Sequence, residues 1–254
     1  MKIVFIGAGN LAFILSKALQ DAGLEIIQVY SRTEESAKAL ARLLDVTYTT
    51  DIGCVTEDAS MYIVSVSDSA IEFLAEKLTS LNGLVVHTAG SVTVDVFAGK
   101  LNNYGVLYPL QTFSKKRTVD FSNIPVFIEA NSHENLQTIR MVAETISQNV
   151  FHATSEQRMK LHLAAVFGCN FVNHLYSISS QLAQQAGFDL AVLSPLILET
   201  ACKAIDSRNP NDVQTGPAKR NDRQIMSKHM DMLEIMPEWR SMYNILSENI
   251  KKTK

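Results

Sequence analysis

The chain opens with Lys2-Ile3-Val4-Phe5-Ile6-Gly7-Ala8-Gly9-Asn10-Leu11-Ala12, a short apolar run followed by a glycine-rich turn. The run is rich in β-branched residues and predicts a buried strand. Apolar residues then recur at the spacing of one helix face, at Leu11, Leu15, Ala18 and Leu19. The stretch therefore predicts a strand, a tight turn and a helix, which together begin a βαβ unit.

The turn fits the pattern GxGxxA. In this pattern Gly7 makes the turn, Gly9 lets the backbone approach a diphosphate, and Ala12 permits close packing of helix on sheet. The N-terminus of a helix offers free N–H groups and a positive dipole end, so a diphosphate can bind there without a lysine from the turn. Glycine turns are common, but here the turn lies at a strand-to-helix junction. It predicts a dinucleotide site that includes Gly7, Gly9, Asn10 and Leu11.

The choice of cofactor depends on the residues that follow the second strand, which are Ser31-Arg32-Thr33. A protein that binds NAD usually has Asp or Glu there to bind the ribose 2′-hydroxyl. Without that carboxylate a 2′-phosphate is not repelled, while Arg32 offers a planar donor group and Ser31 and Thr33 offer hydroxyls. We therefore expect NADP(H). The alternative is a solvated Arg32, with Ser31 or Thr33 only capping the next helix.

The first half of the chain alternates strands with helices. Strands are expected at 2–6, 25–30, 46–49, 61–66, 84–87, 106–107, 125–128 and 150–151, with helices starting near 10, 33, 69 and 134. This order predicts an α/β, Rossmann-like, mostly parallel sheet. Ligands bind beyond the carboxyl ends of such strands, so Val66, Ser67, Thr88 and Gly90 are expected along the nicotinamide half of the cleft. Asp68 and Ser69 are also good helix caps, and His87 has the position of a core histidine.

The second half is predicted to be all-helical, with helices near 156–186, 190–206, 222–235 and 238–251. We therefore expect an NADP-binding Rossmann-like domain over 1–153 and a helical domain for substrate binding and dimerisation over 154–254. The division follows from the change of pattern after Thr154 and Ser155.

The composition narrows the class of protein. The 254 residues are 46% hydrophobic and 19% charged with a net charge of −3, which is typical of a globular protein and favours neither nucleic acid nor a membrane surface as a partner. Three widely separated cysteines indicate neither disulfides nor a metal site, and a cytoplasmic location is expected. The N-terminus lacks the apolar core of a signal peptide, and no apolar run is long enough to span a membrane.

Several motifs together carry a resemblance to a known family. They are His87-Thr88-Ala89-Gly90-Ser91, Tyr108-Pro109-Leu110-Gln111-Thr112-Phe113, His162 to Val166 with Asn170, and Thr215-Gly216-Pro217 with Arg220, Asp222 and His229. Over essentially its whole length the chain resembles an uncharacterised family of NADP oxidoreductases with a Rossmann-like N-domain and a C-terminal domain of unknown function. More distantly it is similar in layout to pyrroline-5-carboxylate, ketopantoate and 3-hydroxyisobutyrate-type reductases. The resemblance implies a helical domain like the C-terminal domain of 6-phosphogluconate dehydrogenase, and a homodimer.

Reduction of a carbonyl or imine needs a group that holds the oxygen or nitrogen and supplies a proton. On a regular helix His162 and Asn170 fall on one broad side, so His162 or Lys160 is the expected proton donor, with Asn170 orienting the substrate. A solvated polar stripe is the alternative.

Arg220 is a candidate for binding a substrate carboxylate, and Asp222 and His229 are further substrate candidates. Alternatively Arg220 pairs with an acid and Asp222 caps a helix. The predicted function is an NADP(H)-dependent oxidoreductase that transfers hydride to or from a small carbonyl, hydroxy or imine substrate bound between the domains. The competing hypothesis is a non-catalytic NADP(H) sensor or scaffold.

Overall fold

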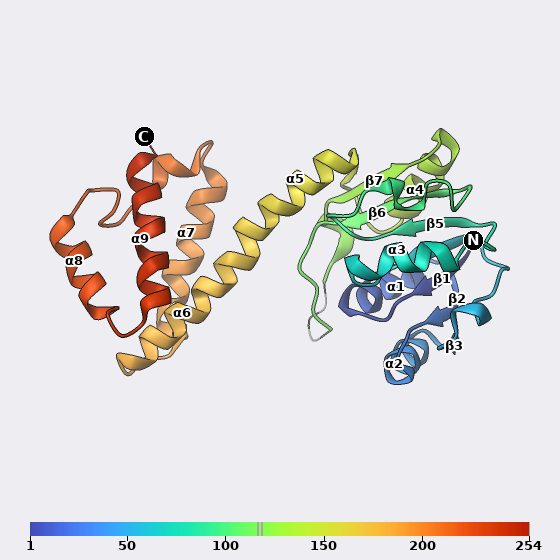
Figure 1. Ribbon diagram of the computed structural model, residues 1–254, viewed down its shortest axis with the longest axis horizontal. Coiled ribbons are helices and arrows are strands. Elements are labelled where there is room, and N and C mark those ends of the chain that lie inside the picture. The colour runs from blue at the N-terminus through green and yellow to red at the C-terminus, as the bar shows by residue number, and fades with distance from the viewer. Residues whose placement is uncertain (116, 118, 254) are drawn as a thin grey trace. The chain divides into compact units, whose positions relative to one another are not determined.

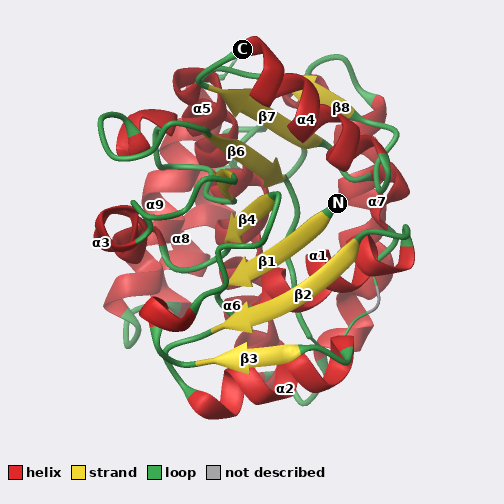
Figure 2. Ribbon diagram, turned by 90° about the vertical axis from the view of Figure 1, so that its right-hand side faces the viewer, coloured by secondary structure: helices red, strands yellow, loops and turns green. Residues whose placement is uncertain are grey.

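The computed structural model describes residues 1–115, 117 and 119–253, and these fall into two compact units, Met1–Gly168 and Cys169–Lys254. The first unit contains one sheet with the strand order β3-β2-β1-β4-β5-β6-β7-β8 (Figures 1 and 2). All pairs are parallel except β6 with β7. The strands are β1 (Lys2–Ile6), β2 (Glu25–Tyr30), β3 (Thr47–Thr49), β4 (Met61–Val64), β5 (Leu84–His87), β6 (Tyr104–Pro109), β7 (Val126–Ala130) and β8 (Val150–His152).

Helices cover both faces of this sheet, so its inner strands are buried on both sides. Ile3 and Phe5 of β1 pack on one face with α1 (Asn10–Asp21), α2 (Glu34–Leu44) and α4 (His133–Glu144). Val4 and Ile6 pack on the other face with α3 (Asp68–Lys77), as expected from the alternation of side chains along a strand. The predicted Rossmann-like, mostly parallel sheet is therefore confirmed.

The order of the strands reverses between β1 and β4. After β1 the chain adds β2 and then β3 on one side of β1, and it then crosses over to place β4 on the other side of β1. Such a switch point opens a crevice at the carboxyl ends of the strands, which is where open α/β sheets bind ligands. The glycine turn after β1 lies at this point.

The second unit is helical. It contains α6 (Val172–Gln185), α7 (Ser194–Asp206), α8 (Arg223–Met232) and α9 (Pro237–Lys252). As predicted, Asp222 is the N-cap of α8 and accepts a hydrogen bond from the Ile225 amide, and Asn221 before it has a left-handed φ of 53°. Among the described residues, no helix combines the length and the apolar character needed to cross a bilayer.

The helix expected over 156–186 is not regular. α5 (Ser155–Ala165) is followed by a π-helical segment, Val166–Phe171, before α6 begins. A π-helical turn holds more residues than an α-helical turn, so side-chain spacing does not carry across it. The regular helix on which the shared side of His162 and Asn170 was predicted is therefore interrupted between the two residues.

Candidate functional site

The glycine turn has the conformation that a nucleotide-binding turn requires. Gly7 has φ +114°, and a Cβ there would lie 2.1 Å from the Ser65 carbonyl oxygen, so a side chain is excluded. Gly9 is the N-cap of α1 and has no side chain to accept the first helical amides. The first turn of α1 also contains no acidic residue. The amides at this helix end thus have no intrahelical partner and remain open to an anion.

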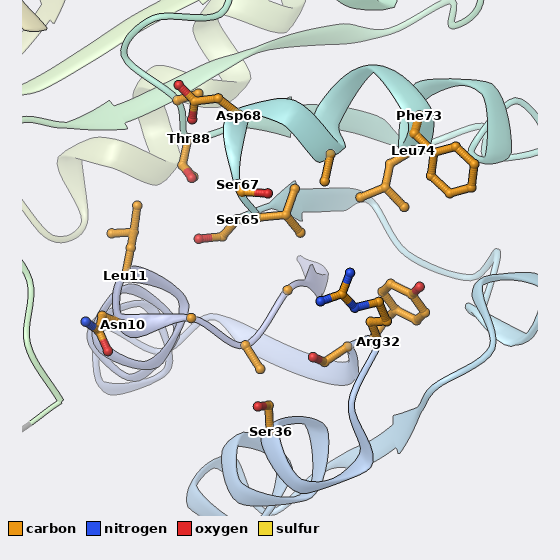
Figure 3. Close-up of a pocket in the computed structure, with 18 of the residues that line it drawn as sticks. Asn10, Leu11, Arg32, Ser36, Ser65, Ser67, Asp68, Phe73, Leu74 and Thr88 are labelled. Atoms are coloured by element: carbon orange, nitrogen blue, oxygen red, sulfur yellow. The ribbon is translucent and has the colours of Figure 1, made fainter.

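A cleft of ≈ 670 Å³ runs from this turn along the carboxyl ends of the strands (Figure 3). It is lined by residues that follow β1, β2, β4 and β5, together with side chains from α2, α3, α5 and β6. Every predicted cofactor-binding residue except Thr33 lines it, namely Gly7, Gly9, Asn10, Leu11, Ser31, Arg32, Val66, Ser67, Thr88 and Gly90. Thr33 is the N-cap position of α2 and makes no side-chain capping bond.

One end of the cleft carries a positive charge. Figure 3 shows the Arg32 guanidinium beyond β2, with Ser36 of α2 on one side of the cleft and Phe73 and Leu74 of α3 on the other. Arg32 is the only lysine or arginine among the described residues that line the cleft. Sequence reasoning missed Ser36, although its place in the first turn of the helix after β2 was a usable signal.

The opposite end carries proton-donating groups. The Tyr108 hydroxyl lies 3.1 Å from Nδ1 of His162, and the two rings meet nearly edge to face. Ser91 donates a hydrogen bond to the Asp68 carboxylate. Because α3 begins at Asp68, its N-cap position is Ser67 and not Asp68 or Ser69. Burial raises the pKa of the Tyr108 phenol above its usual value. Sequence reasoning had noted Tyr108 only as part of a family motif.

A buried ion pair fixes the start of α5, the helix that carries His162. Arg158 is 1% exposed and pairs with Glu129 of β7, and its guanidinium also donates to the carbonyls of Ala89 and Val92. Ser155, the first residue of α5, donates to the same carboxylate through its amide and its hydroxyl. The Arg158–Glu129 pair and its hydrogen bonds therefore hold together the loop after β5 and the first turn of α5. Arg158 lies about one helical turn before His162 in α5.

A segment beyond β6 packs against the glycine turn. Asn10 donates its side-chain amide to the Phe113 carbonyl, and the Lys115 ammonium lies 3.4 Å from the Ala8 carbonyl oxygen and 3.7 Å from the centre of the Phe13 ring. Lys115 brings a positive charge to the glycine turn, although it does not line the cleft. It does not come from the turn itself and had no signal in the sequence pattern.

The remaining predicted residues are Lys160 in the first unit and Asn170, Arg220, Asp222 and His229 in the second. Lys160 is exposed and paired with Glu156 at 2.6 Å. Asn170 belongs to the π-helical segment. Nδ1 of His229 lies 2.9 Å from the Tyr243 hydroxyl and ties α8 to α9.

The residues present fit NADP(H). The open amides at α1 suit a diphosphate, and the absence of a carboxylate among the cleft residues after β2 removes the usual partner of the NAD ribose. Arg32 lines the cleft and carries the kind of charge that a 2′-phosphate would require. Fold and site together define a dinucleotide-binding oxidoreductase.

Comparison with known proteins identifies the family. Residues 2–99 match the family described as "NADP oxidoreductase coenzyme F420-dependent", and residues 124–250 match a domain of unknown function, DUF2520. A protein from Bacteroides fragilis assigned as an NADP oxidoreductase is 47% identical, with a TM-score of 0.94 over 99% of this chain and 98% of that chain. The chain belongs to this family of NADP oxidoreductases, and its cofactor is NADP. No curated protein matches the chain.

More distant solved structures share the fold. A 1-pyrroline-5-carboxylate reductase from Streptococcus pyogenes is 14% identical with a TM-score of 0.65, covering 99% of this chain and 98% of that chain. An imine reductase from Myxococcus stipitatus, in complex with NADP⁺, is 13% identical with a TM-score of 0.70, covering 99% and 93%. Likeness at this level extends to the fold and no further.

Proposed function

We propose that the protein transfers a hydride between NADP(H) and a small carbonyl, hydroxy or imine compound bound between a domain of residues 1–153 and a domain of residues 154–254. Bound NADP(H) supplies or accepts the hydride. One observation carries the proposal: His162, which lies beyond residue 153, lines the same cleft as the glycine turn and lies beside Tyr108.

Each part of the cleft has a proposed task. Gly7, Gly9, Asn10 and Leu11 receive the diphosphate at the N-terminus of α1. Ser31, Arg32 and Thr33 bind the 2′-phosphate, and Val66, Ser67, Thr88 and Gly90 contact the nicotinamide half. His162, with Lys160 as the alternative, is the source of the proton that the reduced substrate gains, and Asn170 orients the substrate. Arg220, Asp222 and His229 are the proposed substrate contacts of the helical domain.

The function is tested by calorimetry with NADPH, followed by NADPH oxidation monitored by fluorescence against small aldehydes, ketones, 2-keto acids and cyclic imines. We expect binding and turnover of at least one class. Absence of NADPH binding would refute the proposal at its first step. Binding without turnover, unchanged by His162→Ala and Asn170→Ala, would favour the competing hypothesis of a non-catalytic sensor or scaffold.

Arg32→Ala is expected to weaken NADPH binding by about tenfold to a hundredfold and to leave NADH affinity nearly unchanged, because only NADPH has the 2′-phosphate. Titration of both cofactors against wild type and variant measures the difference. The control is Arg42→Ala, which removes an exposed arginine of α2 outside the cleft. Equal weakening of both cofactors by Arg32→Ala would remove the proposed role.

We further propose a homodimer formed through the helical domain, in the cytoplasm. Within residues 169–253 the buried hydrophobic residues are only Ala218, Met226 and Leu233, whereas large apolar side chains such as Ile205 and Ile235 are 81% and 87% exposed. A helical unit with so few buried apolar residues needs an apolar partner. All three cysteines are unpaired and exposed, which suits a reducing compartment.

A further inference from the structure

We propose that Tyr108 is the residue that donates the proton to the substrate, and that His162 restores that proton through Nδ1. This assigns a catalytic role to Tyr108 and makes His162 the second member of a pair. The inference rests on the proposed reductase function and gives the proton step of that reaction a definite donor. It is carried by the contact between Tyr108, His162 and Gly90.

The position of Tyr108 places its hydroxyl where a substrate atom can meet it. β6 runs parallel to β5, and Tyr108 is near the end of β6, so it lies at the ligand-binding edge of the sheet. The residue is 8% exposed and lines the cleft, so it borders the cavity although most of it is buried. A phenol in this position can hydrogen bond to a carbonyl oxygen or an imine nitrogen.

The protonation state of Tyr108 suits a donor. Burial raises the pKa of the Tyr108 phenol. The positive charge of Arg158 lowers this pKa, and the negative charge of Asp68 raises it further. The hydroxyl therefore keeps its proton at neutral pH and can give it up as charge develops on the substrate. Asp68 from α3 and Arg158 and His162 from α5 are the charged or titratable groups that act on the phenol.

His162 is placed to return a proton to Tyr108. Its Nδ1 lies 3.1 Å from the hydroxyl, and the side chain is only partly buried. An imidazole nitrogen can both accept and donate a proton, and this ring is partly exposed, so it can exchange protons with solvent where a buried phenol cannot. In the reduction, the C=O or C=N carbon gains a hydride and the heteroatom gains the Tyr108 proton. The phenolate then takes the proton from Nδ1 of the His162 imidazolium, which recovers one from solvent.

Gly90 explains how the pair reaches the reaction site. A Cβ at Gly90 would lie 2.8 Å from the Tyr108 hydroxyl oxygen and 2.9 Å from Nδ1 of His162. The backbone after β5, which is proposed to border the nicotinamide, therefore lies directly against the pair. Arg158 holds this loop and α5 together through the Ala89 carbonyl and Glu129.

The test compares Tyr108→Phe with Tyr104→Phe. Both remove one hydroxyl from β6, but Tyr104 packs edge-on against Phe97 and does not line the cleft. With ¹⁵N-histidine-labelled full-length protein, we expect Tyr108→Phe to move the NMR titration midpoint of the His162 ring by about half a pH unit, with no change for Tyr104→Phe. An unchanged His162 titration in Tyr108→Phe would overturn the pair.

Kinetics test the catalytic role separately. With the fastest compound of the panel, Tyr108→Phe should lower kcat by about 10² or more while the Kd for NADPH stays within about threefold. Wild-type turnover by Tyr108→Phe would overturn the inference even if wild type confirms the reductase function. Should wild type bind NADPH but reduce nothing in the panel, the proposed function fails, and the His162 titration still decides whether the pair exists.

Discussion

At the scale of single residues, two glycines of one turn have different tasks. Gly7 has a positive φ and faces the Ser65 carbonyl, so its lack of a side chain serves the fold. Gly9 has an ordinary φ of −78°, and a Cβ there would meet nothing within 4 Å. The space beside Gly9 is therefore open to a ligand, which explains a glycine that the fold does not need.

We expect Gly7→Ala to lower the free energy of unfolding by roughly 3 kcal/mol or more, because the methyl group meets backbone in a strained conformation. Gly9→Ala should change it by less than about 0.5 kcal/mol and still weaken NADPH binding about tenfold. Urea unfolding and calorimetry measure the two quantities. A stable Gly9→Ala protein with normal NADPH affinity would contradict the placement of the diphosphate.

At the scale of elements, the packing of α5 on the sheet determines where the candidate proton donors lie. The Glu129–Arg158 pair fastens the helix to β7, and Arg158 also contacts the loop after β5. A buried pair of this kind is weak evidence of stability, but removing one partner is costly because the other charge stays buried. The same positive charge lies near His87 at the end of β5. The pKa of His87 is lowered to about 3, mainly because the ring is buried and secondly because the Arg158 charge is close.

The His87 shift predicts acid sensitivity. Below about pH 6.5 the unfolded chain binds a proton at His87, whereas the folded protein does not bind one there until about pH 3. The free energy of unfolding that neutral His87 contributes is therefore fully present above pH 6.5 and is lost as the pH falls toward 3. Between pH 7 and pH 5 the resulting loss in the free energy of unfolding is about 2 kcal/mol. Urea unfolding of wild type and His87→Asn at both values measures it. Equal losses in the two proteins would contradict the prediction.

At the scale of the whole molecule, the two units differ in how they bury apolar residues. The first unit encloses two layers of core around its sheet, whereas the described residues of the second bury few apolar side chains. A second copy of the chain is the proposed cover for that surface.

Light scattering during size-exclusion chromatography should give twice the chain mass of 28.1 kDa at micromolar concentration. The double variant Ile205→Asp with Ile235→Asp should shift the protein toward monomer, because charges in an apolar interface are costly to desolvate. Lys228→Asp, an exposed polar position on α8, is the control. A wild-type monomer at this concentration would refute the homodimer.

Local sequence was sufficient to predict the β1–α1–β2 unit and the cofactor, because glycine conformation, hydrophobic spacing and the missing carboxylate after β2 act within about thirty residues. The antiparallel pairing of β7 and the π-helical segment were not predicted, since both depend on packing between distant parts of the chain. The contacts of Tyr108 with His162 and of Asp68 with Ser91 join residues 54 and 23 positions apart. Such pairs leave no periodic signal, so the polar end of the cleft was decided only when tertiary folding brought β6, α3 and α5 together at the edge of the sheet.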